Sequence, residues 1–439
     1  MHTHETTTPQ ERVFLVGAEW KRTRPLLPVE ESLDELERLA DTAGLVVVGR
    51  AIQRFDQPDG ATYIGSGKVE EVKMLVTDQD AGVVIFDDEL LPRQQRDLEE
   101  AFGQNVKVLD RTALILDIFA QHAQTREGQL QVELAQLEYR LPRLTRMWTH
   151  LARQAGGRAG GATGGVGVRG PGEKQIEVDR REIGRRIAAI KEELEAVRAH
   201  RQRHRLKRQQ TELKVVAIVG YTNAGKSTLL NKLTGADVLV EDRLFATLDP
   251  TTRRLETSSG RDILLTDTVG FIQKLPTQIV AAFRATLEEI ADADVLLHVV
   301  DATHPQAAAQ IESVEDTLAE LDLDHIPTVI ALNKVDQLPA GTDPKAGLSL
   351  RHLAAPVSAV TGQGLTELVL LLEAEMERYL RPLQVHLPYN RGDLLAMLYG
   401  RGRVESETHT GTGVTIHARL PERLHAYFQP YLLKVVSHQ

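Results

Sequence analysis

The chain has 439 residues, a length that suggests about three domains, and its 42% hydrophobic and 26% charged residues are typical of a globular protein with a substantial core. It contains no cysteine, which excludes disulfide scaffolds, thiolate zinc sites and thiol catalysis. No apolar run reaches the roughly 18 residues that a membrane span requires, and the polar start, MHTHETTTPQ, lacks a signal-peptide pattern. We therefore expect a cytoplasmic protein.

The net charge of −10 is unevenly distributed along the chain. Residues Leu141–Gln210 include 17 Lys and Arg but only 7 Asp and Glu, so this segment carries +10 and the remainder −20. A charge run by itself is more often a solvated helical face, but such asymmetry also indicates a polyanionic partner.

The first 125 residues alternate short apolar runs with amphipathic stretches, which predicts a small, mostly parallel α/β domain. The helical stretches are Ser32–Ala43 and Pro92–Phe102. The expected strands are Val13–Val16, Leu45–Val48, Val83–Phe86 and Val106–Leu109. The sequence GSGK at Gly65–Lys68 lacks the upstream glycine and the following Ser or Thr of a phosphate-binding loop, so we interpret it as a turn that opens a helix.

Residues 126–212 contain two helical segments with a 3.5-residue apolar period, the signature of helices that pair. The apolar positions are Leu130, Leu134, Leu137, Leu141, Leu144, Trp148 and Leu151 in the first, and Ile183, Ile187, Ile190, Leu194 and Val197 in the second. Between them, Gly156–Gly172 has nine glycines in 17 residues and no acidic residue. The segment therefore predicts an antiparallel helical hairpin with a long tip, which either binds an anionic partner or is merely flexible.

Residues 213–380 begin with an apolar strand, Val215–Val219, followed by Gly220–Ser227 (GYTNAGKS) and a helix. This is G-x-x-x-x-G-K-[ST] in its proper context, a P-loop whose backbone N–H groups and helix N-terminus bind phosphates. Lys226 supplies charge to the β- and γ-phosphates, and the Ser227 hydroxyl binds Mg²⁺.

The other nucleotide motifs follow in order. Asp267 and Gly270 end an apolar strand in D-x-x-G, which predicts a water-mediated contact to Mg²⁺ and an N–H for the γ-phosphate. The Asp336 carboxylate in Asn333–Asp336 can accept hydrogen bonds from N1–H and the 2-amino group of guanine, which adenine lacks, so the nucleotide is GTP. Ser358–Ala359 then offers a backbone N–H to the guanine O6. In this reading Lys226, Asp267 and Gly270 are the catalytic residues.

Two features concern hydrolysis. Leu244–Arg253 contains three threonines that could complete the Mg²⁺ shell, and we retain Thr247 and Thr251 as alternatives at this point. Phe271 occupies the position after D-x-x-G where many GTPases have a water-orienting glutamine, so isolated turnover should be slow. The missing group must come from another residue such as Gln273, from K⁺ near Asn223, or from a partner.

Residues 381–439 predict a small α+β domain, with strands at Gln384–Leu387 and Gly413–Ala418 and helices at Gly392–Leu398 and Pro421–Leu432. The predicted fold is thus α/β: a P-loop GTPase domain preceded by a small α/β domain with a coiled-coil hairpin, and followed by a small α+β domain.

The motifs GYTNAGKS, FATLDPTTR, DTVGF and NKVD, together with the glycine-rich block GGATGGVGVRGPGEKQIEVDRR, resemble the HflX family of translational GTPases; the glycine-rich block separates them from Era-like and Obg-like proteins. The resemblance implies that Thr247 binds Mg²⁺. It also implies a monomer, in part membrane-associated, that binds the large ribosomal subunit with its tip near the peptidyl transferase region and splits stalled or idle ribosomes. Expected RNA contacts are Arg158, Arg169, Arg201, Arg203 and Arg205. Expected GTP and GDP contacts are Gly220, Tyr221, Thr222, Asn223, Ala224, Gly225, Lys226, Ser227, Thr228, Phe245, Ala246, Thr247, Leu248, Asp249, Asp267, Thr268, Val269, Gly270, Asn333, Lys334, Val335, Asp336, Ser358, Ala359 and Val360.

Two other functions remain open at this stage. A GTP-regulated RNA-binding factor for ribosome assembly would use the first domain and the hairpin as a binding module. A signalling switch for a protein partner would leave the basic tip unexplained.

Overall fold

The computed structural model forms two compact units, which we describe separately. Unit 1 comprises Met1–Arg198, Glu241–Asp249 and Ile272–Ala285, and unit 2 comprises Ala199–Val240, Pro250–Phe271 and Thr286–Gln439. The structure describes residues 10–22, 26–103, 105–147, 171–210, 213–235, 244–245, 247–257, 260, 262–274, 290–378, 380–421 and 424–433. Within these, only the backbone is described for residues 145–147, 171–176, 198–210, 400–401 and 421. No helix in this part of the chain is long and apolar enough to cross a membrane.

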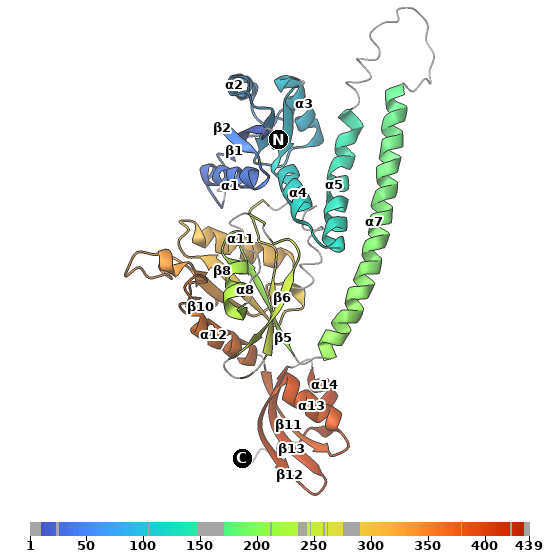
Figure 1. Cartoon of the computed structure of the whole chain (residues 1–439), viewed down its shortest axis with the longest axis vertical. Coiled ribbons are helices and arrows are strands. Elements are labelled where there is room, and N and C mark those ends of the chain that lie inside the picture. The colour runs from blue at the N-terminus through green and yellow to red at the C-terminus, as the bar shows by residue number, and fades with distance from the viewer. Residues whose placement is uncertain are drawn as a thin grey trace, which may run out of the picture. The chain divides into compact units, whose positions relative to one another are not determined.

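The N-terminal domain of unit 1 has a four-stranded parallel sheet in the order β2-β1-β3-β4, shown in blue in Figure 1. Its strands are β1 (Arg12–Trp20), β2 (Val46–Phe55), β3 (Val83–Phe86) and β4 (Lys107–Asp110), and its helices are α1 (Val29–Thr42), α2 (Ser66–Asp78), α3 (Pro92–Phe102) and α4 (Arg111–His122). Helices α1 and α4 pack together on one face, and α2 and α3 on the other. The mostly parallel α/β prediction is confirmed.

Local sequence explains where these helices begin. Gly65 precedes the first residue of α2, as expected for a helix-opening turn. The first helix starts at Val29 rather than at the predicted Ser32, because Pro28 can precede a helix and Ser32 is buried inside it. Asp110 caps α4 by accepting a hydrogen bond from the backbone N–H of Ala113.

Helices α5 (Arg126–Met147) and α7 (Pro171–Gln210) form the predicted antiparallel pair. Leu130 packs against Ile190 and Leu194, with Leu134 and Leu137 alongside, so the apolar period does mark the interface. Ion pairs flank it: Arg126 with Glu193, Arg186 with Glu133, and Lys191 with Glu138. The second helix begins at Pro171, whereas the tip was predicted to extend to Gly172, because proline is favourable at the first helical position. Trp148, Leu151 and most of the tip lie outside the described residues.

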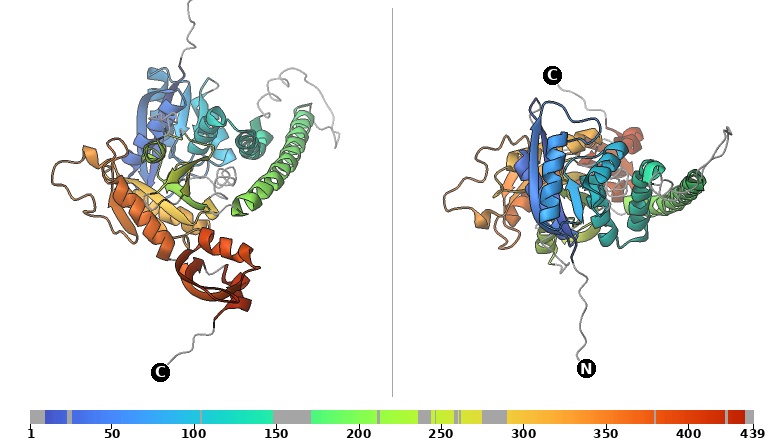
Figure 2. Two further views of the ribbon diagram at one scale, coloured as in Figure 1. Left: turned by 60° about the horizontal axis from the view of Figure 1, so that its bottom comes forward. Right: turned by 90° about the horizontal axis from the view of Figure 1, so that it is seen from above.

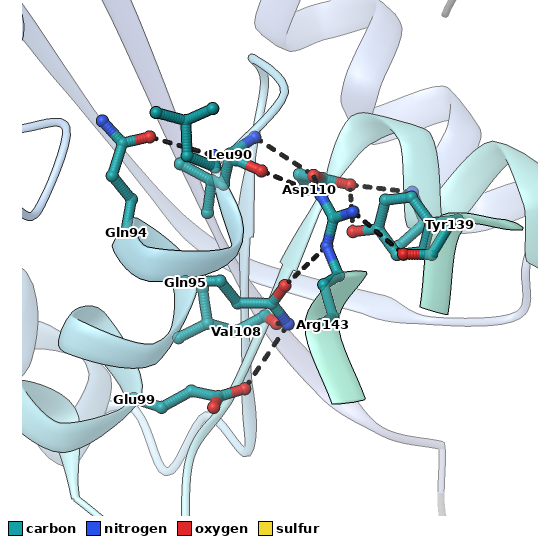
Figure 3. Close-up of polar contacts among 10 residues, drawn as sticks. Leu90, Gln94, Gln95, Glu99, Val108, Asp110, Tyr139 and Arg143 are labelled. Atoms are coloured by element: carbon teal, nitrogen blue, oxygen red, sulfur yellow. Dashed lines mark hydrogen bonds and ion pairs between the residues drawn. The ribbon is translucent and has the colours of Figure 1, made fainter. Parts of the chain in front are cut away.

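A second face of α5, which the heptad pattern did not indicate, binds the N-terminal domain. The Tyr139 hydroxyl donates to Asp110 Oδ1 at 2.8 Å, and the Arg143 guanidinium contacts Asp110 Oδ2 at 3.2 Å. Arg143 also donates to Gln95 Oε1 and to the Leu90 carbonyl, at 3.0 and 2.8 Å. Figure 3 shows these side chains converging from α5 onto the end of β4. The same helix is therefore attached to α7 on one side and to the sheet on the other.

The domain of unit 2 that begins at Lys214 has a six-stranded sheet in the order β10-β9-β8-β5-β7-β6, in which β6 is antiparallel to its neighbour and the other described strands are parallel. Its strands are β5 (Lys214–Gly220), β6 (Thr251–Glu256), β7 (Asp262–Asp267), β8 (Val295–Asp301), β9 (Thr328–Asn333) and β10 (Leu353–Pro356), and its helices are α8 (Lys226–Thr234), α11 (Ala307–Glu320), α12 (Leu365–Arg378) and the 3₁₀ turn η1 (Val335–Gln337). Leu229 and Leu230 of α8 and Leu368 and Leu372 of α12 share one core with the sheet.

Two strands of this domain are not where the apolar pattern indicates. The pattern predicts a strand at Pro356–Ser358, which lies instead at Leu353–Pro356, and residues 357–358 follow it as a loop. Thr251–Glu256, for which the sequence predicts no strand, forms β6, where Thr251 is paired with Asp267 in the register. Its partly exposed, polar sequence gave no apolar signal for a strand.

The C-terminal domain is a three-stranded antiparallel sheet in the order β11-β13-β12, formed by β11 (Leu380–Pro388), β12 (Arg403–His409) and β13 (Gly413–Pro421). Helix α13 (Gly392–Arg401) covers its apolar face with α14 (His425–Phe428), seen in red in Figure 2. The long helix expected at Pro421–Leu432 is instead α14 followed by the 3₁₀ turn η3 (Gln429–Tyr431), because Pro430 cannot continue an α-helix.

Candidate functional site

The loop Gly220–Ser227 joins β5 to α8 and requires glycine at both of its ends. A Cβ on Gly220 would lie 2.2 Å from the Val299 carbonyl oxygen, and one on Gly225 would lie 2.4 Å from Asn333 Nδ2. Both glycines have positive φ, +146° and +93°, and Asn223 has φ +61°. This backbone curls around the N-terminus of α8, which is the arrangement that binds phosphate.

Lys226 is buried at the base of this loop. Its Nζ donates to the carbonyl oxygens of Tyr221 at 2.9 Å and Gly220 at 3.2 Å. In the described part of the chain no carboxylate forms an ion pair with it, and burial lowers the pKa of Lys226 from 10.5 to about 8. A buried ammonium group held by neutral carbonyls is well suited to an anionic ligand.

The residues expected to hold a cation lie together. Ser227 Oγ donates to Asp267 Oδ2 at 2.6 Å, which joins the start of α8 to the end of β7. Among the described residues, Thr222 Oγ1 is buried without a hydrogen-bond partner, so the loop offers a further uncommitted polar atom. One hydroxyl and one carboxylate in contact form the hard oxygen donor set that Mg²⁺ prefers, so these residues fit that ion.

The base-recognition segments are tied to the phosphate loop through one asparagine. Asn333 Nδ2 donates to the Ala224 carbonyl, and Asn333 Oδ1 accepts from the Ala359 N–H, both at 2.9 Å. Lys334, with φ +65°, pairs with Asp301 at 2.7 Å, and Asp336 is exposed in η1. Asp336 is thus open to a base. The Ala359 N–H, expected to donate to guanine O6, already has an acceptor in Asn333.

Phe271 is held against the phosphate loop by its backbone. Its N–H donates to the Gly220 carbonyl at 3.0 Å, and its carbonyl accepts from the Thr222 N–H at 2.8 Å. A Cβ on Gly270 would lie 2.7 Å from Thr222 Cγ2 and 2.9 Å from Lys226 Nζ. D-x-x-G therefore lies directly beside the loop, and Phe271 itself is buried and offers no group to orient water.

The remaining predicted residues fall into three groups. Thr268, Val269 and Ser358 are buried, Val360 is exposed, and Thr228 and Val335 lie in α8 and η1. Phe245, Thr247, Leu248 and Asp249 belong to unit 1, whereas Ser227 and Asp267 belong to unit 2, so the role of Thr247 at Mg²⁺ stays a prediction. Ala246, Arg158 and Arg169 lie outside the described residues, and Arg201, Arg203 and Arg205 are described only as backbone of α7.

Unit 1 gives Asp249 a role that the motif did not suggest. Its Oδ2 accepts from the backbone N–H groups of Gln124 and Thr125, both at 2.9 Å, and its Oδ1 accepts from the Thr125 hydroxyl. The carboxylate therefore lies at the start of α5, where a negative charge is favourable. Phe245 packs edge-on against Phe119, with ring centroids 4.7 Å apart. The sequence gives little sign of the contact between Asp249 and the first turn of α5, because the two lie at least 124 positions apart.

The strand–loop–helix with its buried lysine and the asparagine that links base and phosphate segments define a P-loop GTPase. Three family models match in succession: "GTP-binding GTPase N-terminal" over residues 30–120, "GTP-binding GTPase Middle Region" over 122–208, and "50S ribosome-binding GTPase" over 215–334. The chain is 47% identical to the GTPase HflX of Caldanaerobacter subterraneus over 89% of this chain and 88% of that one. It is 41% identical to the GTPase HflX of Escherichia coli over 89% and 90% of the two chains. The chain belongs to the HflX family of GTPases, and it binds and hydrolyses GTP.

Among solved structures, the chain is similar to a GTP-binding protein described as SsGBP in complex with GDP, with 25% identity, a TM-score of 0.46, and 84% and 99% of the two chains covered.

Proposed function

We propose that this GTPase is a switch that binds the large ribosomal subunit and, in its GTP state, separates stalled or idle ribosomes into subunits. The observation that carries the proposal is the paired helical stem of α5 and α7, whose two helices are joined in the sequence by the glycine-rich, basic segment between Met147 and Pro171. The description of the matched family, a 50S ribosome-binding GTPase, supports the same partner.

The charge distribution supports a ribonucleoprotein partner. Leu141–Gln210 carries +10 in a chain of net charge −10, and its basic residues can contact phosphates without reading sequence. Glycine lets backbone approach folded RNA closely, and ordering this segment costs conformational entropy that a specific docking site must offset. The stem therefore supplies affinity and the tip supplies the functional effect.

In the proposed mechanism the phosphate loop binds the triphosphate, and Lys226 leaves its two carbonyl acceptors to meet the β- and γ-phosphates. Ser227 and Asp267 would hold Mg²⁺, with Thr247 joining in the GTP state, and the bound ion would offset negative charge on the phosphates. Gly270 would donate its N–H to the γ-phosphate, and K⁺ near Asn223 is one source of further positive charge. Because Phe271 cannot orient water, basal turnover is slow until the ribosome reorganises the site.

The test uses three proteins: the parent, a variant with Gly156–Gly170 replaced by a short neutral turn, and a triple charge reversal at Arg201, Arg203 and Arg205. Co-sedimentation with purified subunits, ribosome-stimulated GTPase and light scattering of 70S particles are measured. We expect the tip variant to keep GTP affinity and basal hydrolysis but lose stimulation and splitting. The charge reversal should weaken subunit binding with a reduced salt dependence.

Charge reversals at Lys345, Arg351 and Arg378, exposed on the GTPase domain, provide the matched control for net charge. A tip variant that splits ribosomes as well as the parent would reduce the tip to a linker. Binding to free ribosomal RNA or subunit precursors without any splitting would instead indicate the assembly factor.

A further inference from the structure

We use the name crevice for the carboxyl ends of β1 and β3 in the open, parallel N-terminal sheet. In the order β2-β1-β3-β4 the chain runs from β1 to β2 and then crosses back over β1 to β3, so α1 and α2 cover opposite faces and the strand order switches between β1 and β3. Ligands of such sheets bind at the carboxyl ends of the strands beside that switch point. Here Asp87 and Asp88 follow β3 at this position, and the Asp87 N–H donates to the Val16 carbonyl of β1 at 2.9 Å.

This crevice is acidic and fully buried at its base. Asp87, 0% exposed, accepts from Arg111 at Oδ1, 2.7 Å, and from Ser32 Oγ at Oδ2, 2.6 Å. Arg111 also pairs with the buried Glu35. One guanidinium thus faces two buried carboxylates, and Asp88 adds a third acidic group at the rim. The pKa of Asp87 is raised by burial, and the charge of Lys274 opposes that shift. The cluster therefore requires a second cation.

The chain itself supplies that cation. Lys274 Nζ contacts Asp87 Oδ2 at 2.5 Å and Asp88 Oδ1 at 2.7 Å, and the neighbouring Gln273 donates from Nε2 to Ser32 Oγ at 2.7 Å. Two consecutive side chains therefore enter the crevice, one as an ammonium and one as an amide. Lys274 has φ +53°, a left-handed conformation that is unfavourable for lysine and persists only where surrounding contacts impose it.

These two residues follow closely after the γ-phosphate motif. Gly270 is three residues before Gln273, and Phe271 is bound through its backbone to the phosphate loop. Only Ile272, which is buried, separates the fixed Phe271 from the docked Gln273. A segment pinned at both ends over so short a span cannot move at Gly270 without straining the contacts in the crevice.

We propose that the crevice between β1 and β3 is a binding site for Gln273 and Lys274 of the same chain, a latch that favours GDP over GTP. Gly270 would donate its N–H to the γ-phosphate, so engagement of that phosphate draws Gly270 toward it and against the latch, whereas GDP has no phosphate at that position. The latch contacts of Gln273 and Lys274 are then stronger with GDP bound than with GTP bound. By thermodynamic linkage they raise the affinity for GDP relative to GTP, and GTP binding weakens them to the same extent.

The first test is the ratio of GTP to GDP affinity, measured by fluorescent-nucleotide titration without ribosomes. Lys274→Met keeps the aliphatic stem of a side chain that is 36% exposed, and Asp88→Asn removes the partner at the rim. Each should raise the ratio about fivefold or more, the lower bound of usual coupling between sites. Lys68→Met, which breaks the Lys68–Glu71 pair in α2, is the matched control and should leave the ratio unchanged. A parent-like ratio in both latch variants would overturn the proposal.

The second test uses the absence of cysteine from the chain. A Ser32→Cys, Gln273→Cys double variant is treated with a short thiol cross-linker in the presence of GDP or of a non-hydrolysable GTP analogue, with each single variant as control. We expect rapid intramolecular cross-linking with GDP and at least fivefold slower reaction with the analogue. No cross-linking in either state, or equal rates in both, would contradict the latch. Neither test contains ribosomes, so neither outcome bears on the ribosomal proposal.

Discussion

The N-terminal domain and the GTPase domain bury ionisable groups in opposite ways. In the first, Arg111 lies between Glu35 and Asp87, all of them almost completely inaccessible, and Lys274 supplies a second cation to Asp87. In the second, Lys226 is also buried but is held by two backbone carbonyls. A cluster of ion pairs stabilises one conformation, whereas a buried cation whose hydrogen bonds go to neutral carbonyls retains more of its electrostatic capacity for a ligand.

The type of partner therefore distinguishes a buried charge that stabilises the fold from one that serves a ligand, and no sequence motif is needed to make the distinction. Burial alone does not identify a site, because Arg111 is more completely buried than Lys226, at 1% against 7% exposed. What identifies it is the kind of partner. The comparison predicts that removing charge from the first domain costs stability, and that removing charge from the second costs function.

The largest effect is expected at Arg111. Arg111→Met should lower the free energy of unfolding by about 3–5 kcal/mol, because the buried Glu35 loses its ion pair with Arg111 and the buried Asp87 keeps its ion pair with Lys274 alone. Chemical denaturation followed by circular dichroism measures this loss. Arg186→Met, which breaks an exposed pair with Glu133, is the control and should cost about 0–1 kcal/mol. Equal losses of unfolding free energy in the two variants would show that the buried ion pairs of Arg111 contribute no more than the exposed pair of Arg186 and Glu133.

Lys226 is expected to show the reverse pattern. Lys226→Met should reduce GTP hydrolysis by about 100- to 1000-fold, as for removal of one preorganised charge donor. Its unfolding free energy should stay at or above that of the parent, because no carboxylate in the described part of the chain loses an ion-pair partner. Single-turnover kinetics and denaturation of the same preparation measure both quantities. If the variant were inactive because it unfolds, Lys226 would be needed for stability, and its assignment as a charge that serves ligand binding would be wrong.

Asp336 tests an exposed charge with a functional role. Asp336→Asn should weaken GTP binding by about 10- to 100-fold, the range for one lost hydrogen bond to a charged group. An amide can donate to the 2-oxo group of xanthine, so the variant should gain affinity for xanthosine triphosphate. Competition between GTP and XTP measures the exchange of specificity. Retained GTP preference without any gain for XTP would place base recognition elsewhere.

The smallest effect concerns His298, which is buried in β8. Burial, followed by the charges of His352 and Lys226, lowers the pKa of His298 from 6.5 to about 3. The unfolded chain therefore binds this proton more readily between those values, and the folded state loses about 1.4 kcal/mol for each pH unit below 6.5. His298→Gln should lack this component when unfolding is compared at pH 7 and 5.5. An imidazole that titrates near 6.5 by NMR would contradict the shift.

The contiguous features of the GTPase domain could be predicted because their chemistry is local. A phosphate loop needs glycines at set positions between one strand and one helix, so the sequence of Gly220–Ser227 predicts such a loop. The structure has the expected positive φ angles at Gly220 and Gly225. The 3.5-residue period likewise indicated the face that Leu130 presents to Ile190 and Leu194. In both cases each residue's role depends on neighbours fewer than ten positions away or on a regular repeat.

The contacts assembled from distant segments could not be predicted in this way. Ser32, Asp87 and Lys274 meet although 187 positions separate the last two, and no periodicity marks any of them. Tyr139 and Arg143 point away from the heptad face of α5, so the pattern that found the hairpin concealed their contact with Asp110. The edge strand β6 was missed because its side chains are mostly exposed and polar.

One contact described above also has a mechanical consequence. Asp249 holds the first turn of α5 through the N–H groups of Gln124 and Thr125, and it follows Thr247 by only two residues. Helix α5 has 22 residues and at 1.5 Å per residue is about 33 Å long. A helix is stiff along its axis, so a displacement of Thr247 that pulls on Asp249 would load the first turn of α5 and be carried along the helix toward Met147, beyond which the glycine-rich segment follows in the sequence. Pro142, inside the last turns of α5, is the point where this coupling would be weakest.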